Sequence, residues 1–370
     1  MRIYCLLFVL WGFPLETSAQ ESRFLSTDRH ILGSEGDLTA SLTFFDADGD
    51  GDLDVVFANG RHWAQVNEIY LNNGIGQFTY GYPVGPEKAT SYAAPAGDLD
   101  GDGDLDLVIG NDRAENWVYL NDGTGRFEIA WTVSSEIEPT RSAQLYDINS
   151  DGNLDVLVTN RGVANGFYLN DGTGHFGEKH AFGDPMGSTI AVAAADLNGD
   201  GRTDLVLANR DGQANKILLN DGNLDFVEGS SFGTGTDETR GVALADLNND
   251  RQLDIITANI GEPNSVHFGL GDGTFQESVA FGGVEATYAL AIADMDQDGD
   301  LDIVVANVNS ANSVYLNSDE GTRWTEVKLG NFNATTYGLD IGDLNHDGYP
   351  DLGFGNSNSF NRIFYNTGPR

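Results

Sequence analysis

Cysteine is nearly absent from the sequence: Cys5 is the only one, and it lies close to the N-terminus. A single thiol can form no internal disulfide, and it cannot build a metal site made of several cysteines. We expect Cys5 to be removed with the N-terminal segment discussed below, so that the mature chain would hold no thiol. Its stability would then have to come from packing, hydrogen bonds and bound ions.

Basic residues are also scarce, since 19 Lys and Arg residues stand against 57 Asp and Glu residues, for a formal net charge of −38. Such a charge opposes binding to nucleic acids and to anionic membrane surfaces, whose phosphates need basic partners. Cations are the partners that this composition favours. Because 40% of the residues are hydrophobic, the chain can form a folded core and is not a disordered acidic tail.

Long hydrophobic runs are missing beyond the N-terminus. Residues 1–19 begin with Arg2, continue through the apolar run Ile3–Leu15 and end in small residues before Gln20. This order is typical of a signal peptide, and we predict cleavage near Ala19. A buried strand or helix is the alternative for this segment. No later run supplies the roughly 18 apolar residues that a membrane helix needs. We therefore expect a secreted protein, extracellular or periplasmic, without membrane insertion.

A repeat fills most of the remaining chain. A nine-residue acidic pattern, D-x-[DN]-x-D-x-x-x-D, occurs seven times at intervals of 48 to 52 residues. Its copies begin at Asp46, Asp98, Asp147, Asp196, Asp246, Asp294 and Asp343. A fixed period of about 20 to 50 residues indicates a chain built from repeated supersecondary units.

Each repeat predicts four short antiparallel strands. In the fourth unit, for example, the acidic loop leads into the apolar stretch Asp204–Ala208, then Lys216–Leu219, then a stretch that begins with Phe226. A further stretch, such as Ile190–Ala195, precedes each loop. Short apolar runs between Gly, Asn and Asp turns are typical of strands, and four-stranded units are typical of propeller blades. We predict an all-β, seven-bladed β-propeller, with residues 20–370 forming a single domain.

The two ends of the chain predict how the ring closes. Only three strands fit between Asp343 and the C-terminus, whereas residues 23–33 resemble the missing fourth strand. We therefore expect the N-terminal strand to complete the seventh blade. Pairing the first strand with the last would leave no free sheet edge, and it would fasten the ring without a disulfide.

The acidic pattern supplies the oxygen ligands that calcium prefers. Calcium takes about 6 to 8 oxygens, and carboxylates at positions 1, 3, 5 and 9 of a tight loop can converge on one ion, with a backbone carbonyl at position 7. Every change at the four carboxylate positions is Asp to Asn, which keeps an oxygen ligand. A simple acidic turn, the alternative, needs only one Asp or Asn.

We predict up to seven structural calcium ions, one in each loop. The predicted ligands at positions 1, 3, 5, 7 and 9 are Asp46, Asp48, Asp50, Asp52 and Asp54; Asp98, Asp100, Asp102, Asp104 and Asp106; Asp147, Asn149, Asp151, Asn153 and Asp155; Asp196, Asn198, Asp200, Arg202 and Asp204; Asp246, Asn248, Asp250, Gln252 and Asp254; Asp294, Asp296, Asp298, Asp300 and Asp302; and Asp343, Asn345, Asp347, Tyr349 and Asp351. The fifth loop has Arg251 where the other six have glycine. A left-handed backbone there would cost about 1–2 kcal/mol, so we expect this site to be the weakest.

The acidic loops occur together with a second recurring phrase. Examples are Leu120-Asn-Asp-Gly-Thr-Gly-Arg-Phe127 and Leu169-Asn-Asp-Gly-Thr-Gly-His-Phe176. In this combination all seven units resemble the FG-GAP and VCBS repeats, the family that includes the propeller of integrin alpha subunits. The resemblance implies calcium on the lower face, in the loop between the first two strands, and protein or glycan partners on the upper face. It does not identify the ligand.

Positions that vary between repeats are candidates for ligand binding. A Ser or Thr hydroxyl stands seven residues before each loop, from Thr39 to Thr336. A pair of asparagines also recurs in each unit. We interpret both features as structural. The next position varies: it is Ala40, Tyr92, Arg141, Ile190, Arg240, Tyr288 and Tyr337. Neighbouring loops add His62, Trp117, Arg161 and Arg210, among others.

Aromatic rings and guanidinium groups suit sugars and carboxylates. We therefore predict ligand contacts from Arg61, Trp63, Tyr92, Arg113, Arg141, Arg240, Tyr288 and Tyr337. Packing between blades, or pairing with nearby acids, is the alternative role for these side chains.

These features favour a non-enzymatic, monomeric module that binds an extracellular protein or glycan. A polysaccharide lyase or hydrolase is the main alternative, and a structural component of an envelope or surface complex is a third. Against an enzyme, the six histidines are scattered along the sequence and no nucleophile motif is visible. The sequence therefore predicts no catalytic residues and no cofactor other than Ca²⁺.

Overall fold

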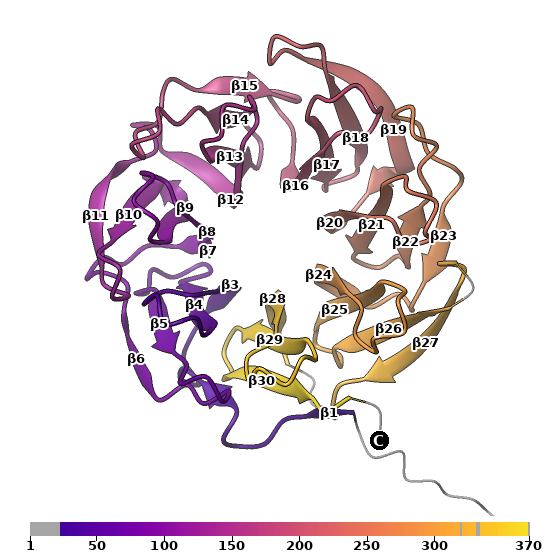
Figure 1. The fold of residues 1–370 in the computed structure, drawn as a ribbon. Coiled ribbons are helices and arrows are strands. Elements are labelled where there is room, and N and C mark those ends of the chain that lie inside the picture. The colour runs from indigo at the N-terminus through magenta and orange to yellow at the C-terminus, as the bar shows by residue number, and fades with distance from the viewer. Residues whose placement is uncertain (1–22, 319, 331–333, 369–370) are drawn as a thin grey trace, which may run out of the picture.

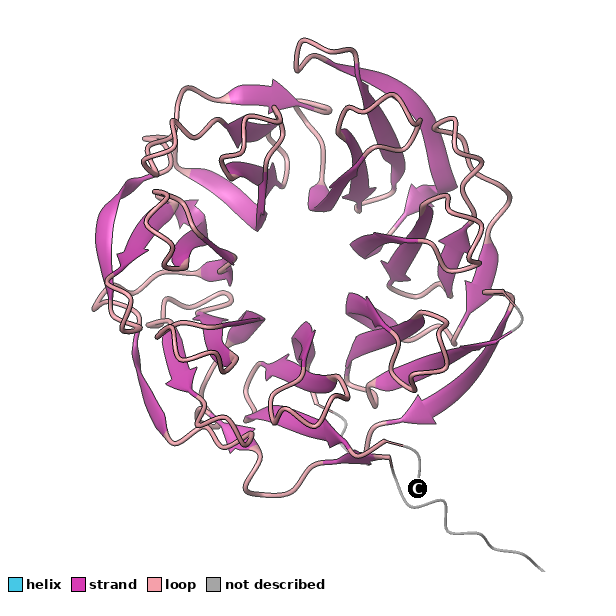
Figure 2. Ribbon diagram, viewed as in Figure 1, coloured by secondary structure: helices cyan, strands magenta, loops and turns pink. Residues whose placement is uncertain are grey.

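The structure, a computed structural model, describes residues 23–318, 320–330 and 334–368. The predicted signal peptide, residues 1–19, lies outside the described residues. Strands and loops make up the whole of the described chain, which contains no helix (Figure 2). Within that part there is accordingly no helix long and apolar enough to cross a membrane.

Four sheets each contain four antiparallel strands in sequence order, and each sheet corresponds to one repeat. They consist of β3 (Thr39–Phe45), β4 (Asp54–Asn59), β5 (Glu68–Leu71) and β6 (Tyr80–Pro83); β16 (Thr189–Ala195), β17 (Asp204–Asn209), β18 (Gln213–Asn220) and β19 (Phe226–Asp237); β20 (Thr239–Ala245), β21 (Asp254–Asn259), β22 (Asn264–His267) and β23 (Val279–Phe281); and β24 (Ala286–Ala293), β25 (Asp302–Val308), β26 (Ser313–Ser318) and β27 (Arg323–Lys328). The sheets stand around a common axis, with the first strand of each innermost (Figure 1).

Two further repeats are joined in one sheet of nine strands. Its strands are β7 (Ser91–Ala93), β8 (Ala96–Gly97), β9 (Asp106–Ala114), β10 (Trp117–Asn121), β11 (Phe127–Thr132), β12 (Glu138–Tyr146), β13 (Asp155–Asn160), β14 (Asn165–Tyr168) and β15 (His180–Phe182). The expected first strand is divided into β7 and β8 around Pro95, because proline has no N–H for the ladder. The long strand β12 also pairs with β9 of the preceding repeat, through Glu138↔Ala114 and Pro139↔Asp112.

The last sheet combines the two ends of the described chain. It contains β28 (Thr336–Gly342), β29 (Asp351–Asn356) and β30 (Asn361–Asn366), and two short strands, β1 (Phe24–Leu25) and β2 (Ile31–Leu32), pair with β30. Their registers are Phe24↔Asn366 and Leu32↔Asn361. The inner three strands of this sheet thus come from the C-terminal repeat, and the N-terminal segment supplies its outer edge.

The hydrophobic core lies between neighbouring sheets. The second strand is buried along its whole length in five repeats, as in β4 and β29, and over its first six residues in the other two, β9 and β25. Both faces of these strands pack against other sheets. The first strands contact one another in the order β3, β7, β12, β16, β20, β24 and β28, and β28 contacts β3 again. Apolar packing therefore continues from each sheet to the next, including from the last sheet to the first.

Buried hydroxyls connect the repeats at the start of the first strands. Thr39 Oγ1 donates to Asn59 Oδ1 of its own repeat (2.8 Å), and Ser91 Oγ accepts from Asn67 Nδ2 of the preceding repeat (3.1 Å). All seven hydroxyls donate in this way, and six of them also accept: Ser91, Thr140, Thr189, Thr239, Thr287 and Thr336. Because these groups are buried, their mutual hydrogen bonds avoid a large desolvation cost.

The junction between the last and first repeats is built differently. The Nδ2 of Asn361, which corresponds to the donors at the other junctions, is buried and has no hydrogen-bond partner among the described residues. Other bonds cross this junction: the Asn72 amide donates to the Leu344 carbonyl (2.8 Å), and the Phe44 N–H donates to the Asp340 carboxylate (2.7 Å). Together with the pairing of β1 and β2 to β30, they hold the two ends of the chain.

Phe24 gives a direct test of how much the N-terminal strand contributes. Its side chain is 3% exposed and packs in a core cluster with Phe354 and Phe364. The change Phe24→Ala would leave a cavity there, and we expect it to lower the free energy of unfolding by about 3–5 kcal/mol. Urea denaturation followed by tryptophan fluorescence would measure this loss.

The matched control is Leu25→Ala in the same strand, because the Leu25 side chain is 45% exposed. We expect it to change stability by less than about 1 kcal/mol. Equal denaturation midpoints for the two variants would mean that the N-terminal strand does not support the core.

Candidate functional site

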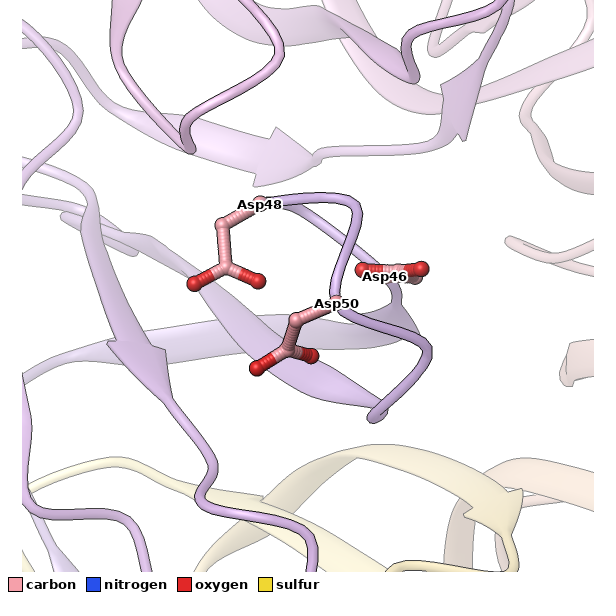
Figure 3. A group of neighbouring side chains, drawn as sticks. All are labelled: Asp46, Asp48 and Asp50. Carbon is pink, nitrogen blue, oxygen red and sulfur yellow. The ribbon is translucent and has the colours of Figure 1, made fainter.

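The acidic loops connect the first two strands of each repeat. In the first loop the Asp46 carboxylate accepts the N–H groups of Gly49 (2.8 Å) and Gly51 (3.0 Å), which folds the chain into a tight turn. Both glycines have positive φ angles, of 73° and 92°, which cost glycine little. The side chains of Asp46, Asp48 and Asp50 lie around this turn (Figure 3), each with a carboxylate oxygen within 4.8 Å of the others.

The aspartate at position 9 is buried in every repeat and fixes the loop to the sheet. Asp54 accepts the N–H of Ala47 at loop position 2 (3.0 Å) and the N–H of Asn72 at the end of the third strand (2.8 Å). The same two bonds recur at Asp106, Asp155, Asp204, Asp254, Asp302 and Asp351. Burial raises the pKa of Asp54 to about 7, so the negative charge there is costly without a nearby cation.

Three of the loops gather carboxylates closely enough to hold one ion. Oxygen atoms lie within 4.8 Å of one another in three groups: Asp46, Asp48 and Asp50; Asp98, Asp100 and Asp106; and Asp294, Asp296 and Asp302. Burial, followed by repulsion from Asp50, raises the pKa of Asp48. Within the described chain, Oδ1 of Asp48 and Oδ1 of Asp296 are buried without a hydrogen-bond partner.

This donor set fits the calcium ion that the sequence predicts. All the side-chain donors are carboxylate oxygens, and hard cations such as Ca²⁺ prefer such ligands. A bound ion would offset the repulsion between the carboxylates and would supply the partner that the buried oxygens of Asp48 and Asp296 lack.

The other four loops satisfy their central carboxylates internally. With Asn at position 3, the side-chain amide donates to the carboxylate at position 5: Asn149 to Asp151 (2.9 Å), Asn248 to Asp250 (2.9 Å) and Asn345 to Asp347 (3.2 Å). In the fourth loop Arg202 pairs with Asp200 at 2.5 Å. The three loops with Asp at position 3 therefore differ from the four with Asn there. This difference is visible in the sequence, but the prediction treated all seven loops alike.

The fifth loop has the unusual backbone that its sequence suggests. Arg251 adopts a φ of 71°, and its N–H donates to the Asp246 carboxylate (2.8 Å). Glycine at the same position of the other loops has a φ between 83° and 98°. The arginine therefore takes the conformation that the hydrogen bond requires, although its Cβ makes this conformation unfavourable.

Replacing Arg251 by glycine would relieve this strain. We expect Arg251→Gly to raise the free energy of unfolding by about 1 kcal/mol in EDTA, because glycine adopts positive φ without steric cost. Thermal and urea denaturation would measure the gain. The reverse change in an otherwise similar loop, Gly201→Arg, should lower stability by a similar amount. If both variants match the wild type, backbone strain does not distinguish the fifth loop.

A cavity of about 250 Å³ lies at the opposite end of the first strands. All seven variable residues line it: Ala40, Tyr92, Arg141, Ile190, Arg240, Tyr288 and Tyr337. The loops between second and third strands add Arg61, His62, Arg161 and Arg210. Each variable residue stands six residues before position 1 of its acidic loop, so about 20 Å of strand separates the cavity from the loops.

Arginines and tyrosines are stacked against one another in this cavity. The Arg61 guanidinium lies 3.5 Å from the centre of the Tyr337 ring, and Arg240 lies 4.7 Å from that of Tyr288. The two tyrosine rings make an edge-to-face contact, with their centres 4.7 Å apart. Residues far apart in the sequence thus form one cluster, in which each cation is held by the π face of a ring.

Three arginines of the cavity have acidic partners. Arg141 contacts Asp112 at 2.9 Å, while Arg161 and Arg210 contact Asp211 at 2.9 Å and 3.1 Å. These pairs fix the position of the guanidinium groups around the cavity. Their remaining N–H donors are the groups with which a ligand could interact.

Six of the eight predicted ligand-contacting residues line the cavity, and two do not. The Trp63 side chain is 76% exposed, and that of Arg113 is 75% exposed beside Asp112 (3.6 Å). Trp63 belongs to a loop whose direction the repeat pattern does not specify, and Arg113 lies near the end of β9, beyond the buried part of that strand. The prediction omitted Ser41 and Ser142, which line the cavity directly after two of the variable positions. The sequence could have predicted them, because each directly follows a variable position.

His62 is the one histidine of the described chain that lines the cavity. Its Nδ1 lies 3.5 Å from the hydroxyl of Tyr92, whose ring also carries the Arg141 guanidinium at 4.7 Å from its centre. Burial lowers the pKa of His62, and the positive charge of Arg61 lowers it further. The imidazole is therefore neutral near pH 7 and can accept a proton.

These features define an all-β protein of propeller-like architecture, with oxygen-rich loops at one end of its inner strands and a basic cavity at the other. The FG-GAP-like repeat model matches residues 46–109, 98–158, 147–207, 196–257, 246–305 and 294–354. The chain belongs to the FG-GAP-like repeat family.

Solved structures share this fold, with 735 matching chains. They include two crystal structures of BBS1N in complex with ARL6DN, soaked with lead and with mercury. Each match has a TM-score of 0.61 and 14% sequence identity, and covers 94% of this chain and 98% of the other. At this identity the likeness shows the fold alone. The search of curated proteins finds no match.

Proposed function

We propose that the seven repeats form the blades of a closed β-propeller. Two observations support this arrangement: residues from the first strand of every repeat line one cavity, and β28 contacts both β24 and β3. The pairing of β1 and β2 with β30 would then complete the seventh blade.

In this proposal calcium stabilises the propeller, and the loops of Asp48, Asp100 and Asp296 bind it most tightly. These loops bring three carboxylates together and lack the internal Asn-to-Asp bond of the other loops. An ion that binds only the folded protein adds to stability by mass action, by about 2.7 kcal/mol per site at a concentration 100 times Kd. The protein would act after secretion, where calcium is plentiful.

The function that the geometry supports best is non-enzymatic binding of an extracellular protein or glycan, by a monomer. The main support for this proposal is the cavity, which is lined by five arginines although the protein has a net charge of −38. Ions at the opposite end of the strands would keep those strands rigid without taking part in binding. BBS1N, which has the same fold, was crystallised in complex with ARL6DN, and this is consistent with a propeller that binds another protein.

One experiment tests both parts of this function. The mature protein is screened against arrays of glycans and extracellular proteins in millimolar calcium and again in EDTA, with melting temperatures recorded alongside. We expect a higher melting temperature in calcium and a bound ligand that the double variant Arg141→Ala, Arg240→Ala no longer retains. Loss of these side chains removes charge-assisted hydrogen bonds, each worth about 1.5–3 kcal/mol.

A matched pair of triple variants separates the two kinds of loop. Changing Asp48, Asp100 and Asp296 to Ala should remove most of the calcium-dependent rise in melting temperature. Changing Asn149, Asn248 and Asn345 to Ala should leave most of it. A melting temperature that is the same in calcium and EDTA would refute the stabilising role of calcium. A ligand retained by the arginine double variant would exclude the cavity as its site.

A second candidate function, β-elimination on an acidic polysaccharide, is favoured by the contact between His62 and Tyr92. Neutral His62 would take the proton from the carbon next to the sugar carboxylate. The bond from the neighbouring carbon to the leaving oxygen would break, that oxygen would take the proton of Tyr92, and a carbon–carbon double bond would remain. Arg141 would stabilise the negative charge that develops on the carboxylate.

The lyase alternative has a simple assay. Incubation with oligogalacturonate should produce an unsaturated sugar that absorbs ultraviolet light, and His62→Ala or Tyr92→Phe should lower the rate at least about 100-fold. His180→Ala is the control, since His180 stacks on Phe167 and is not among the residues that line the cavity. If the wild type forms no such product, the cavity is a binding site and not a lyase site.

A further inference from the structure

The arginines of the cavity outnumber the acidic groups that they contact. Arg141, Arg161 and Arg210 have ion-pair partners, as described above. For Arg61 and Arg240, no carboxylate of the described residues lies within 4 Å of the guanidinium nitrogens. Arg61 and Arg240 are thus held by tyrosine rings and not by carboxylates, and their positive charges remain available to an anionic ligand.

The stacking of these two arginines indicates what they can recognise. The guanidinium groups of Arg61 and Arg240 lie over the rings of Tyr337 and Tyr288, so each covers one face of its ring. These covered faces are not open to stacking by a neutral sugar. The N–H donors lie in the plane of the guanidinium group and point outward from its edges, where they can bind an oxyanion.

Two buried polar atoms of the cavity have neither a hydrogen-bond partner nor an ion-pair partner among the described residues. Within the described part of the chain, the Nε of Arg240 and the Oγ of Ser41 make no hydrogen bond although both are buried. Burial also lowers the pKa of Arg240, which means that its charge is poorly solvated. An unpaired buried donor costs free energy that a bound acceptor would recover.

We propose that the cavity binds the carboxylate of a uronic-acid sugar, with Arg61 and Arg240 as the anion-binding residues. The carboxylate fits the in-plane donors of the two arginines, and the sugar hydroxyls fit Ser41 and Ser142. This inference rests on the proposed binding function and names the ligand class for that site.

The shape of the site favours a sugar over a protein partner. A cavity of about 250 Å³ on the axis of the sheets admits a single compact group. Protein interfaces are broader, typically about 800 Å² on each partner, and are mostly flat. Trp63 and Arg113 are exposed and available for such a surface, but Arg61 and Arg240, which have no carboxylate partner among the described residues, line the cavity.

Calorimetry with oligosaccharides of galacturonate and glucuronate tests the proposal. The probe and its methyl ester have nearly the same shape but differ in charge. We expect the acid to bind at least about tenfold more tightly than the ester, and more weakly as salt is added. Arg61→Gln and Arg240→Gln should each weaken binding of the acid by about tenfold or more.

Arg113→Gln is the control, because Arg113 lies outside the cavity lining, and its affinity for the acid should equal that of the wild type. Equal binding of acid and ester would overturn the inference and leave a glycan-binding function intact. Binding of an acidic peptide by these arginines, without binding of uronates, would overturn the sugar assignment and leave a protein-binding function. If neither sugars nor proteins bind, both the inference and the proposed function fail.

Discussion

The architecture depends on seven buried hydroxyl groups, six of which form hydrogen bonds with two repeats. A hydroxyl such as Thr140 donates to Asn160 of its own repeat and accepts from Asn116 of the preceding one. Since such polar groups are costly to bury alone, each repeat is complete only when its neighbour is in place. The hydroxyls also fix where the inner strands begin. The next residue of each strand therefore faces the axis, and this position is the one that varies and lines the cavity.

The same strands separate opposite charges. Aspartates gather at one end, where Asp54 and its equivalents tie the loop to the sheet, and arginines gather at the other. Because about 20 Å of strand lies between them, the two groups neutralise each other little. Changes at the variable position alter the cavity without touching the loops, so binding and stability can change independently.

The sequence predicts the repeat units, their strands and the acidic loops, because each depends on a local pattern that recurs. It also predicts that the variable position faces a common space, since a fixed place in a strand keeps a fixed direction. The stacking of Arg61 on Tyr337 could not be predicted in this way, because it joins the first and last repeats, which are neighbours in space but distant in the sequence. The outward direction of Trp63 depends on a loop that no repeat pattern describes. The pairing of β9 with β12 arises because β12 is longer than the other first strands, and the regular spacing of the repeats gives no sign of this length.

The junction between the last and first repeats has a consequence for the order of folding. Phe24 pairs with Asn366, so the first described strand meets its partner only after nearly the entire chain has been made. Every other junction joins consecutive repeats and can form as synthesis proceeds. A growing chain therefore carries an open edge at its start throughout synthesis. The return of the N-terminal strand joins residues more than 300 positions apart, and a shortened chain that ends before β30 would lack the strand that β1 and β2 pair with.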